Sequence, residues 1–430
     1  MPFFCTSMHI HGVSYFSSDS GLAKSARFAM ERFEAMGHQI SVTNLTTGDA
    51  RSSRNQQWGP LKRNAKRARN AMDFLHVNPG EFSTSIAMDG PKVLSRKNAF
   101  MVCMPYCELP RVPLRWVRRL NALDAVLAPT AFIGAALRDS GVTTPIIDMP
   151  VGIDLPPADV LPDRARFGMP EGRFVFMSGM DLSSGTRRKN PEAPVETFLK
   201  AFGPEEGHVH LVVKVNNPEL TDETKRKWVQ LQEKTAAYPN IQLIREAIPE
   251  AELNTFFASC DACVSLHRSE GLGLVPLEMM ALGKPVITTD WSGNMDYCTP
   301  ENAMLVPHVQ IPVDDNHPVY METLEDFPDV TWADPDIDAA AVCMEALAQD
   351  PARAAALGKA GRRAVESRRQ ADWSGAMAEL ARLRASWRGT TDAQRRVRES
   401  WQQPQPTRIE LLKRAYYEAK IELRRRVAGK

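Results

Sequence analysis

The chain has 430 residues, 43% of them hydrophobic and 24% charged, which is ordinary for a globular protein of about two domains. No stretch approaches the ~18 consecutive apolar residues of a membrane span, and the N-terminus lacks the basic region and apolar run of a signal peptide. The seven cysteines are scattered, which predicts a reducing cytoplasm. Cys260 and Cys263 form a lone CxxC, which we interpret as buried small hydrophobic residues rather than a metal site.

The net charge of +1 hides an asymmetry along the chain. Residues 382–430 contain 14 Lys and Arg against 5 Asp and Glu, and the segment 51–70 has seven basic residues and no acidic one. Residues 407–426 also place apolar side chains at helical spacing, which predicts an amphipathic helix. Segments 51–70 and 407–426 are therefore expected to meet an anionic partner, such as a membrane surface or a phosphorylated substrate. The alternatives are that they form solvated loop and helix faces, and that the helix at 407–426 packs its apolar side chains on the body of the protein.

Short apolar segments alternate with helix-like segments in the first third of the chain. The strand-like segments are 8–16, 38–45, 72–79, 99–106, 124–130 and 146–154. An amphipathic helix is expected at 22–37, between the first two. This alternation predicts a parallel sheet covered by helices. A proline-rich stretch near position 155 predicts a hinge, so we place an N-terminal Rossmann-like domain at 1–155.

The same alternation restarts after the hinge and predicts a second Rossmann-like domain at 156–375. Its strand-like segments are 173–181, 208–217, 241–247, 261–268 and 284–290. The acidic segment 310–335 is expected to be a loop. The remaining residues, 376–430, are expected to form helices that cross back to the N-terminal domain and end in the basic tail. The fold class is thus α/β, with two units in series.

The stretch HRSEGLGLVPLEMMALGKPVI, residues 267–287, places Glu270 and Glu278 eight positions apart around a glycine-rich turn. Ligands of parallel α/β sheets bind outside the carboxyl ends of the strands, where this turn is expected to lie. Gly271 and Gly273 allow a close backbone approach, and the start of the following helix can face a phosphate. Glu278 can accept hydrogen bonds from a ribose, and Glu270 can reach a sugar beside the diphosphate. Taken singly, each glutamate is better explained as a helix cap or a solvated side chain, and it is the pair in this glycine-rich context that favours the ligand roles.

A second candidate element is SGMDLSSGTRRKNPEAP, residues 178–194, again a strand followed by a loop and a helix. Arg188 and Lys189 are expected where the helix begins, with Pro191 just inside it. Cations and helix-start N–H groups together predict a diphosphate site. Lys214 is a weaker third cation. The sequence has no Walker A loop and no GxGxxG after the first strand, which disfavours P-loop kinases and nicotinamide enzymes.

These elements resemble the family-4 retaining glycosyltransferases of the GT-B fold. The glutamate pair with the following WSGN, 291–294, is similar to the donor-site signature of that family, and RKNP at 188–191 to its diphosphate-binding element. The N-terminal half matches more loosely, through HVNP at 76–79 and CELPRVP at 107–113. The resemblance covers roughly residues 9–375. It implies two Rossmann-like domains that face each other across a cleft.

The resemblance also implies roles for particular residues. It makes Arg188 and Lys189 diphosphate ligands, Glu278 the ribose ligand and Glu270 the carboxylate beside the donor sugar, with Gly271, Gly273 and Leu274 lining the same site. Gly21 would be the N-domain glycine that faces the phosphates. Apart from the resemblance, His76 and Glu108 lie near expected strand ends on the acceptor side, where a structural hydrogen-bonding role is favoured over catalysis. The sequence departs from the family in its loop after the strand, where the usual arginine is missing. Either Arg187 or Arg188 can replace it.

The function implied by the resemblance is transfer of a hexose from a UDP- or GDP-linked sugar to a hydroxyl of a glycan or lipid-linked acceptor. Retention of configuration is expected, with no protein nucleophile, no cofactor and no bound metal. The expected setting is bacterial polysaccharide or lipopolysaccharide assembly, in the cytoplasm or on the inner face of its membrane. The alternatives are a non-catalytic homologue acting as a scaffold, and a nucleotide-sugar epimerase or hydrolase. A nucleic-acid partner is not expected, because no recognition helix or aromatic-rich basic motif is present. The sequence does not indicate the oligomeric state.

Overall fold

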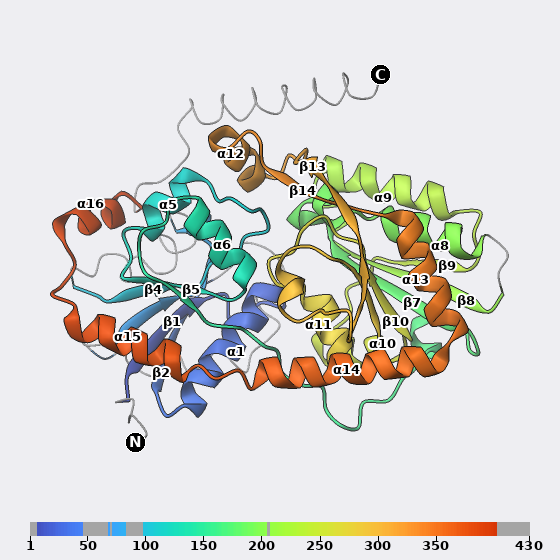
Figure 1. Ribbon diagram of the computed structural model, residues 1–430, viewed down its shortest axis with the longest axis horizontal. Helices are drawn as coiled ribbons and strands as arrows, with labels where there is room; N and C mark the ends of the chain where they lie inside the picture. The colour runs from blue at the N-terminus through green and yellow to red at the C-terminus, as the bar shows by residue number, and fades with distance from the viewer. Residues whose placement is uncertain (1–6, 46–67, 69–70, 83–97, 204–206, 402–430) are drawn as a thin grey trace. The chain divides into compact units, whose positions relative to one another are not determined.

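The structure, a computed structural model, describes residues 7–45, 68, 71–82, 98–203 and 207–401 (Figure 1). The chain divides into two compact units. Unit 1 comprises 1–152, 318–328 and 371–430, and unit 2 comprises 153–317 and 329–370. The main boundaries lie close to positions 155 and 375 expected from the sequence. The return of 318–328 to unit 1 was not expected.

Unit 1 is built on a six-stranded parallel sheet with the order β2-β1-β3-β4-β5-β6. Its strands are β1 (His9–Ser14), β2 (Gln39–Asn44), β3 (Met72–Leu75), β4 (Met101–Cys103), β5 (Ala125–Ala128) and β6 (Ile146–Asp148). Its helices are α1 (Gly21–Ala35), α5 (Leu114–Leu120), α6 (Ala131–Asp139), α12 (Pro318–Asp326), α15 (Ser374–Ser386) and α16 (Asp392–Ser400). Two apolar cores form on this unit, and all its central strands are buried.

The C-terminal helices complete the cores of unit 1, against which they lie in Figure 1. Trp373, just before α15, packs its ring 5.4 Å from that of Phe33 on α1, and its indole N–H donates to the carbonyl of Pro150 at 2.9 Å. The ring of Trp401, after α16, lies 4.9 Å from that of Phe82, centroid to centroid, and is tilted against it by 51°. Residues 371–401 are therefore structural parts of unit 1. The basic segment 407–426 lies outside the described residues, as does 51–70 except for Ala68.

Unit 2 has a second six-stranded parallel sheet, with the order β12-β11-β10-β7-β8-β9. Its strands are β7 (Phe174–Asp181), β8 (Val209–Asn216), β9 (Ile241–Ile244), β10 (Ala262–Ser265), β11 (Val286–Thr289) and β12 (Met304–Val306). Its helices are α7 (Thr186–Lys189), α8 (Ala193–Phe202), α9 (Asp222–Thr235), α10 (Glu250–Ala258), α11 (Leu274–Ala281), α13 (Ile337–Gln349) and α14 (Pro351–Arg369). Because β7 and β10 are parallel neighbours, the loops that follow them emerge at the same edge of the sheet.

The prediction of a loop at 310–335 is wrong. The segment holds strand β13 (His308–Pro312), helix α12 and strand β14 (Thr331–Pro335), and β13 pairs with β14 in an antiparallel ribbon. Helix α12 packs within unit 1, where Tyr320 and Met321 are buried and Glu322 pairs with Arg115 at 2.7 Å. The nine-residue helix lies between prolines and acidic residues, which is why its short apolar face was not apparent from periodicity.

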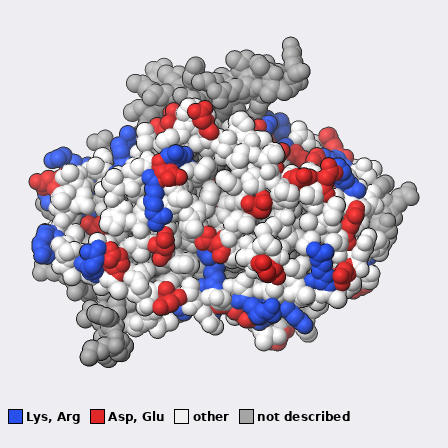
Figure 2. Space-filling model, viewed as in Figure 1, with Lys and Arg blue, Asp and Glu red and all other residues white. Residues whose placement is uncertain are grey.

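Within the described residues, no helix has the length and apolarity needed to cross a membrane. On the face shown in Figure 2, described acidic and basic side chains are interspersed. The cysteines at 260 and 263 are buried and unpaired with each other, and burial raises the pKa of the Cys260 thiol to about 12. This agrees with their interpretation as small core residues.

Candidate functional site

The loop after β7 forms a one-turn helix, α7, instead of leading directly into the long helix α8. Gly185 precedes α7 with a φ of 100°, a backbone conformation that glycine adopts without strain. Asn190 ends it in the left-handed region, which asparagine tolerates. The prediction that Arg188 and Lys189 stand at the start of the long helix is therefore wrong. Both lie in the last turn before α8, and Pro191 lies between the two helices.

The structure brings Arg188 and Lys189 together with Glu270, although the two segments are about eighty positions apart in the chain. The Lys189 ammonium lies 2.5 Å from Glu270 Oε1, and an Arg188 guanidinium nitrogen lies 3.2 Å from the same oxygen. The two segments follow neighbouring parallel strands, so their meeting at the carboxyl edge is a consequence of the sheet order. We call these three residues the RKE cluster.

The RKE cluster holds its carboxylate in the ionised form. Burial raises the pKa of Glu270, but the adjacent Lys189 and Arg188 cations lower it more, to about 2. At neutral pH the cluster therefore carries one negative and two positive charges. A site with this excess of positive charge is suited to an anionic group such as a diphosphate.

The two cations of the RKE cluster differ in exposure. Arg188 is 1% exposed and donates to the backbone carbonyls of Ser184 and Ser269, so most of its guanidinium is used to join the loops after β7 and β10. The side chain of Lys189 is 18% exposed. An ammonium has three N–H donors, and Glu270 takes one of them. Lys189 is therefore the cation better placed to reach a ligand, and Arg188 the one that orients the cluster.

Two further basic candidates, Arg187 and Lys214, contact residues of unit 2 other than Glu270. Arg187 pairs with the carboxylate of Asp314. Lys214, near the end of β8, is 6% exposed and donates to Asn216 Oδ1 at 2.6 Å. Burial lowers the pKa of Lys214 to about 8. The structure thus does not place Lys214 in the RKE cluster.

The segment WSGN, 291–294, hydrogen-bonds to the backbone of Glu270, where the glycine-rich turn begins. The hydroxyl of Ser292 accepts the backbone N–H of Glu270, and the N–H of Gly293 donates to the Glu270 carbonyl, each at 2.8 Å. A Cβ on Gly293 would lie 1.9 Å from the carbonyl oxygen of Gly271, so only glycine fits there. Ser292 and Gly293 were singled out only as part of a motif, and the structure shows that they fix the turn.

Helix α11 begins directly after this turn, as the sequence predicted. Gly273 is its N-cap, with a φ of 79°, and Leu274 is its first residue. Tyr297 donates its hydroxyl to the Gly273 carbonyl at 2.6 Å, which fixes the point where the helix starts. Glu278 lies in the second turn and is half-buried. Glu278 therefore lies on the helix that follows the glycine-rich turn, one helical turn beyond the start of that helix.

The candidates in unit 1 lie at the carboxyl edge of its own sheet. Gly21 is the first residue of α1, and His76 follows β3. His76 is buried, and its Nε2 lies 3.0 Å from Ser25 Oγ, which is 2.5 Å from the Tyr106 hydroxyl. Burial lowers the pKa of His76 to about 4, so the ring is neutral at neutral pH. His76 acts there through hydrogen bonds rather than charge, in a network with Ser25 and Tyr106 that the sequence did not reveal.

Glu108 is engaged away from that network. Its Oε2 accepts the Tyr320 hydroxyl of α12 at 3.3 Å. Glu108 therefore helps to hold α12 in place. This contact is separate from the role toward an acceptor that was expected from the sequence.

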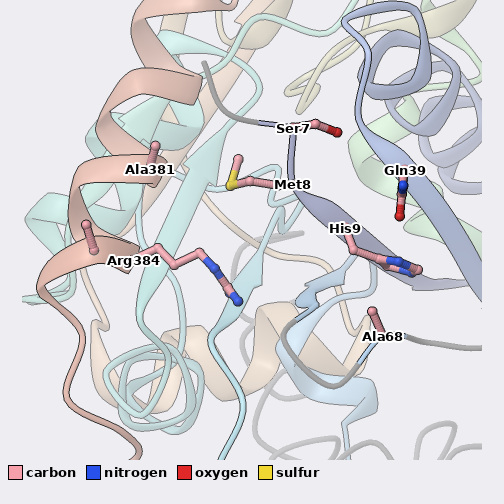
Figure 3. A pocket seen from close by; sticks show the side chains of 8 residues that line it. Ser7, Met8, His9, Gln39, Ala68, Ala381 and Arg384 are labelled. Atoms are coloured by element: carbon pink, nitrogen blue, oxygen red, sulfur yellow. The ribbon is translucent and has the colours of Figure 1, made fainter. Parts of the chain in front are cut away.

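A pocket elsewhere in unit 1 does not belong to this site (Figure 3). It lies between the start of β1, the start of β2 and helix α15, and Arg384 points into it. Its lining residues are Ser7, Met8, His9, Gln39, Ala68, Ala381, Arg384 and Ala385. These residues lie at the amino end of the sheet, whereas ligands of parallel sheets bind at the carboxyl end.

Comparison with protein families matches residues 183–313 to the family described as Glycosyl transferases group 1. The matched segment, less than half of the chain, contains the RKE cluster and Glu278. The resemblance to these enzymes predicted from the sequence is confirmed for this segment. A search of the curated proteins found no match.

Solved structures of glycosyltransferases share the fold. Sucrose-phosphate synthase from Thermosynechococcus elongatus is 17% identical with a TM-score of 0.60, over 87% of this chain and 98% of that one. HepE from Anabaena, solved with UDP and glucose, is 14% identical with a TM-score of 0.56, over 88% and 100%. Trehalose 6-phosphate synthase from Burkholderia multivorans is 14% identical with a TM-score of 0.55, over 88% and 98%.

These comparisons define the class of the protein. Its fold is the GT-B fold, with two Rossmann-like units and C-terminal helices, and the fold predicted from the sequence is thereby confirmed. Residues 183–313 are similar in sequence to the group 1 glycosyl transferases.

Proposed function

We propose that this protein is a retaining, family-4 glycosyltransferase that moves a hexose from a UDP- or GDP-linked sugar to a hydroxyl of a glycan or lipid-linked acceptor. The observation that carries the proposal is the RKE cluster, at the carboxyl edge of the unit 2 sheet and beside the helix that bears Glu278. The match of residues 183–313 to group 1 glycosyl transferases supports it, and so does the UDP and glucose held by the structurally similar HepE. The proposed setting is cell-surface polysaccharide or lipopolysaccharide assembly at the inner face of the cytoplasmic membrane.

The proposed chemistry assigns each group of the site a role. When the sugar–phosphate bond breaks, negative charge develops on the diphosphate, and the Lys189 ammonium stabilises it. Glu270 keeps Lys189 in place and lies beside the sugar. The acceptor hydroxyl attacks the face that the phosphate leaves, and its proton passes to the departing phosphate oxygen. The configuration is then retained without a protein nucleophile, and the proposal requires no bound metal.

The proposal is tested first by binding. Thermal unfolding of the full chain is measured with UDP, GDP and their common sugar conjugates, because a ligand at a hundredfold excess over its Kd stabilises by ~2.7 kcal/mol. The nucleotide sugar that binds is then incubated with membrane and glycan acceptors, and the anomeric configuration of the product is read by NMR. We expect transfer of the sugar to an acceptor, with its anomeric configuration retained. Binding without turnover would support the scaffold alternative, and release of free sugar the epimerase or hydrolase alternative.

Lys189→Ala is expected to weaken nucleotide-sugar binding and to slow transfer about ten- to hundredfold, the value of a charge-assisted hydrogen bond of ~1.5–3 kcal/mol. Isothermal titration with the nucleotide and steady-state kinetics measure the two effects. Lys200→Ala serves as the matched control, because Lys200 pairs with Asp338 on the surface of the same unit. Equal kinetics for wild type and a folded Lys189→Ala variant would remove Lys189 from the site.

A further inference from the structure

Helix α7 receives its N-terminal capping group from a distant part of the chain. The first N–H groups of a helix have no partner within the helix, and a Ser, Thr, Asp or Asn side chain usually accepts them. The residue in that position here, Gly185, has no side chain. Asp315 supplies the oxygen instead: its Oδ2 accepts the backbone N–H of Arg187 at 2.9 Å and that of Arg188 at 3.2 Å.

Asp315 is fixed in this position. It is 1% exposed, and its second oxygen, Oδ1, accepts the N–H of His317 at 2.8 Å. The carboxylate thus joins α7 to the connection between β13 and α12, and both of its oxygens are engaged. A carboxylate is the group best suited to the positive end of a helix, because it meets N–H donors and the helix dipole together.

The residues that Asp315 holds lead directly to the RKE cluster. The N–H of Arg188 is bound by Asp315, and the side chain of Arg188 reaches Ser269 and Glu270. Lys189, the next residue, pairs with Glu270. A one-turn helix has little stability of its own, since helix formation requires several turns to offset its nucleus. The cap at Asp315 is therefore one of the contacts that hold α7, and with it Lys189, in place.

We propose that Asp315 is a positioning residue for the donor: it caps α7 and so holds Arg188 and Lys189 in the arrangement in which Lys189 binds the diphosphate. This inference rests on the proposed function. Asp315 does not need to touch the substrate. Its carboxylate acts through the backbone of α7.

The test compares Asp315→Ala with Asp336→Ala in the full chain. Asp336 caps α13 by accepting the N–H groups of Asp338 and Ala339, and α13 carries none of the site residues. Both variants lose one capping carboxylate in unit 2, a buried one at Asp315 and an exposed one at Asp336, and urea unfolding of each variant measures its general effect on stability. The probes are UDP, GDP and the nucleotide sugar that wild type binds most tightly, measured by isothermal titration. Hydrogen exchange of the peptide 183–190 is measured in parallel.

Asp315→Ala is expected to raise the Kd for the nucleotide roughly five- to thirtyfold, the equivalent of losing an N-cap, and to speed exchange in residues 183–190. Asp336→Ala is expected to leave both unchanged. Asp315→Asn, which keeps the shape and one acceptor oxygen, is expected to lie between wild type and Asp315→Ala, and it replaces the alanine variant if that variant does not fold.

Normal nucleotide binding by wild type and by a folded Asp315→Ala variant would overturn the positioning role and leave the proposed function standing. An equal loss of binding in Asp336→Ala would also overturn it, because the effect would then be one of general stability. Failure of wild type to bind any of the nucleotides would overturn the proposed function, and the positioning role with it.

Discussion

Glu270→Ala should give a protein that turns over its donor at least ten- to hundredfold more slowly and that is also less stable. Removing the carboxylate takes away a charged partner of the buried Arg188 guanidinium, and removal of one partner of a buried ion pair costs ~3–5 kcal/mol. It also frees Lys189 from the position in which it would meet the phosphate. Steady-state kinetics and urea unfolding measure the two losses separately.

Glu278→Ala provides the contrast on the same helix. Its carboxylate is half-buried one turn beyond the start of α11, and its proposed partner is the ribose. We expect this variant to raise the KM for the donor while kcat changes little, as for the loss of an interaction made equally in the ground state and the transition state. A reversal, with Glu278→Ala impaired in kcat and Glu270→Ala only in KM, would contradict the proposed roles.

The stability contributed by Glu270 should depend on pH in a defined direction. The pKa of Glu270 is lowered from 4.5 to about 2 in the folded protein, so the folded state takes up this proton at a lower pH than the unfolded state does. The contribution is therefore fully present above about pH 4.5 and is lost as the pH falls toward 2. At 1.36 kcal/mol per pKa unit it amounts to roughly 3 kcal/mol.

Glu270→Gln removes this titration while preserving the shape of the side chain. Urea unfolding at pH 7, 4.5 and 3 is expected to show a smaller loss of stability between pH 4.5 and 3 for Glu270→Gln than for wild type. Parallel pH profiles for the two proteins would mean that Glu270 is not held ionised by its neighbours.

Arg398→Ala is expected to produce a large loss of stability in unit 1. The side chain is 1% exposed and bridges α16 to the sheet. It donates to the carbonyls of Ala122 and Ala99 and pairs with Asp124 at 3.1 Å. The variant leaves a buried carboxylate and two carbonyls without this donor, which costs ~3–5 kcal/mol. At ~2–4 °C per kcal/mol, Tm should fall by roughly 6–20 °C.

Arg395→Ala is the matched control for Arg398→Ala. It lies on the same helix, removes the same charge, and pairs only at the surface with Asp392. Exposed pairs contribute ~0–1 kcal/mol, so little change in Tm is expected. Equal Tm values for the two variants would show that α16 is not held through Arg398.

The sequence predicted those parts of the fold and the site that depend on local pattern. Alternating apolar segments indicated two parallel sheets, and the glycines around Glu270 indicated a turn followed by a helix. The sequence could not predict the capping of α7, because the oxygen comes from Asp315, more than a hundred positions away. The burial of Arg188 was hidden for the same reason: its partners, Ser269 and Glu270, belong to another loop.

The prediction of a loop at 310–335 was wrong for a different physical reason. Helix α12 is stabilised by packing of Tyr320 and Met321 and by the pair between Glu322 and Arg115, not by a strong intrinsic preference. Short helices in proteins depend on such tertiary contacts. A sequence pattern reveals an element of this kind only once its packing partners are known.

The passage of the chain between the two units, four times in all, has a consequence for how the protein is made. The core around Phe28 and Phe33 needs Trp373, Met377 and Leu380, which the ribosome adds only after unit 2 has been synthesised. At ~5–20 residues per second, the delay is on the order of 10–40 s. During that time the first 152 residues carry an uncovered apolar surface. The nascent chain should therefore depend on chaperones that hold it until α15 is available.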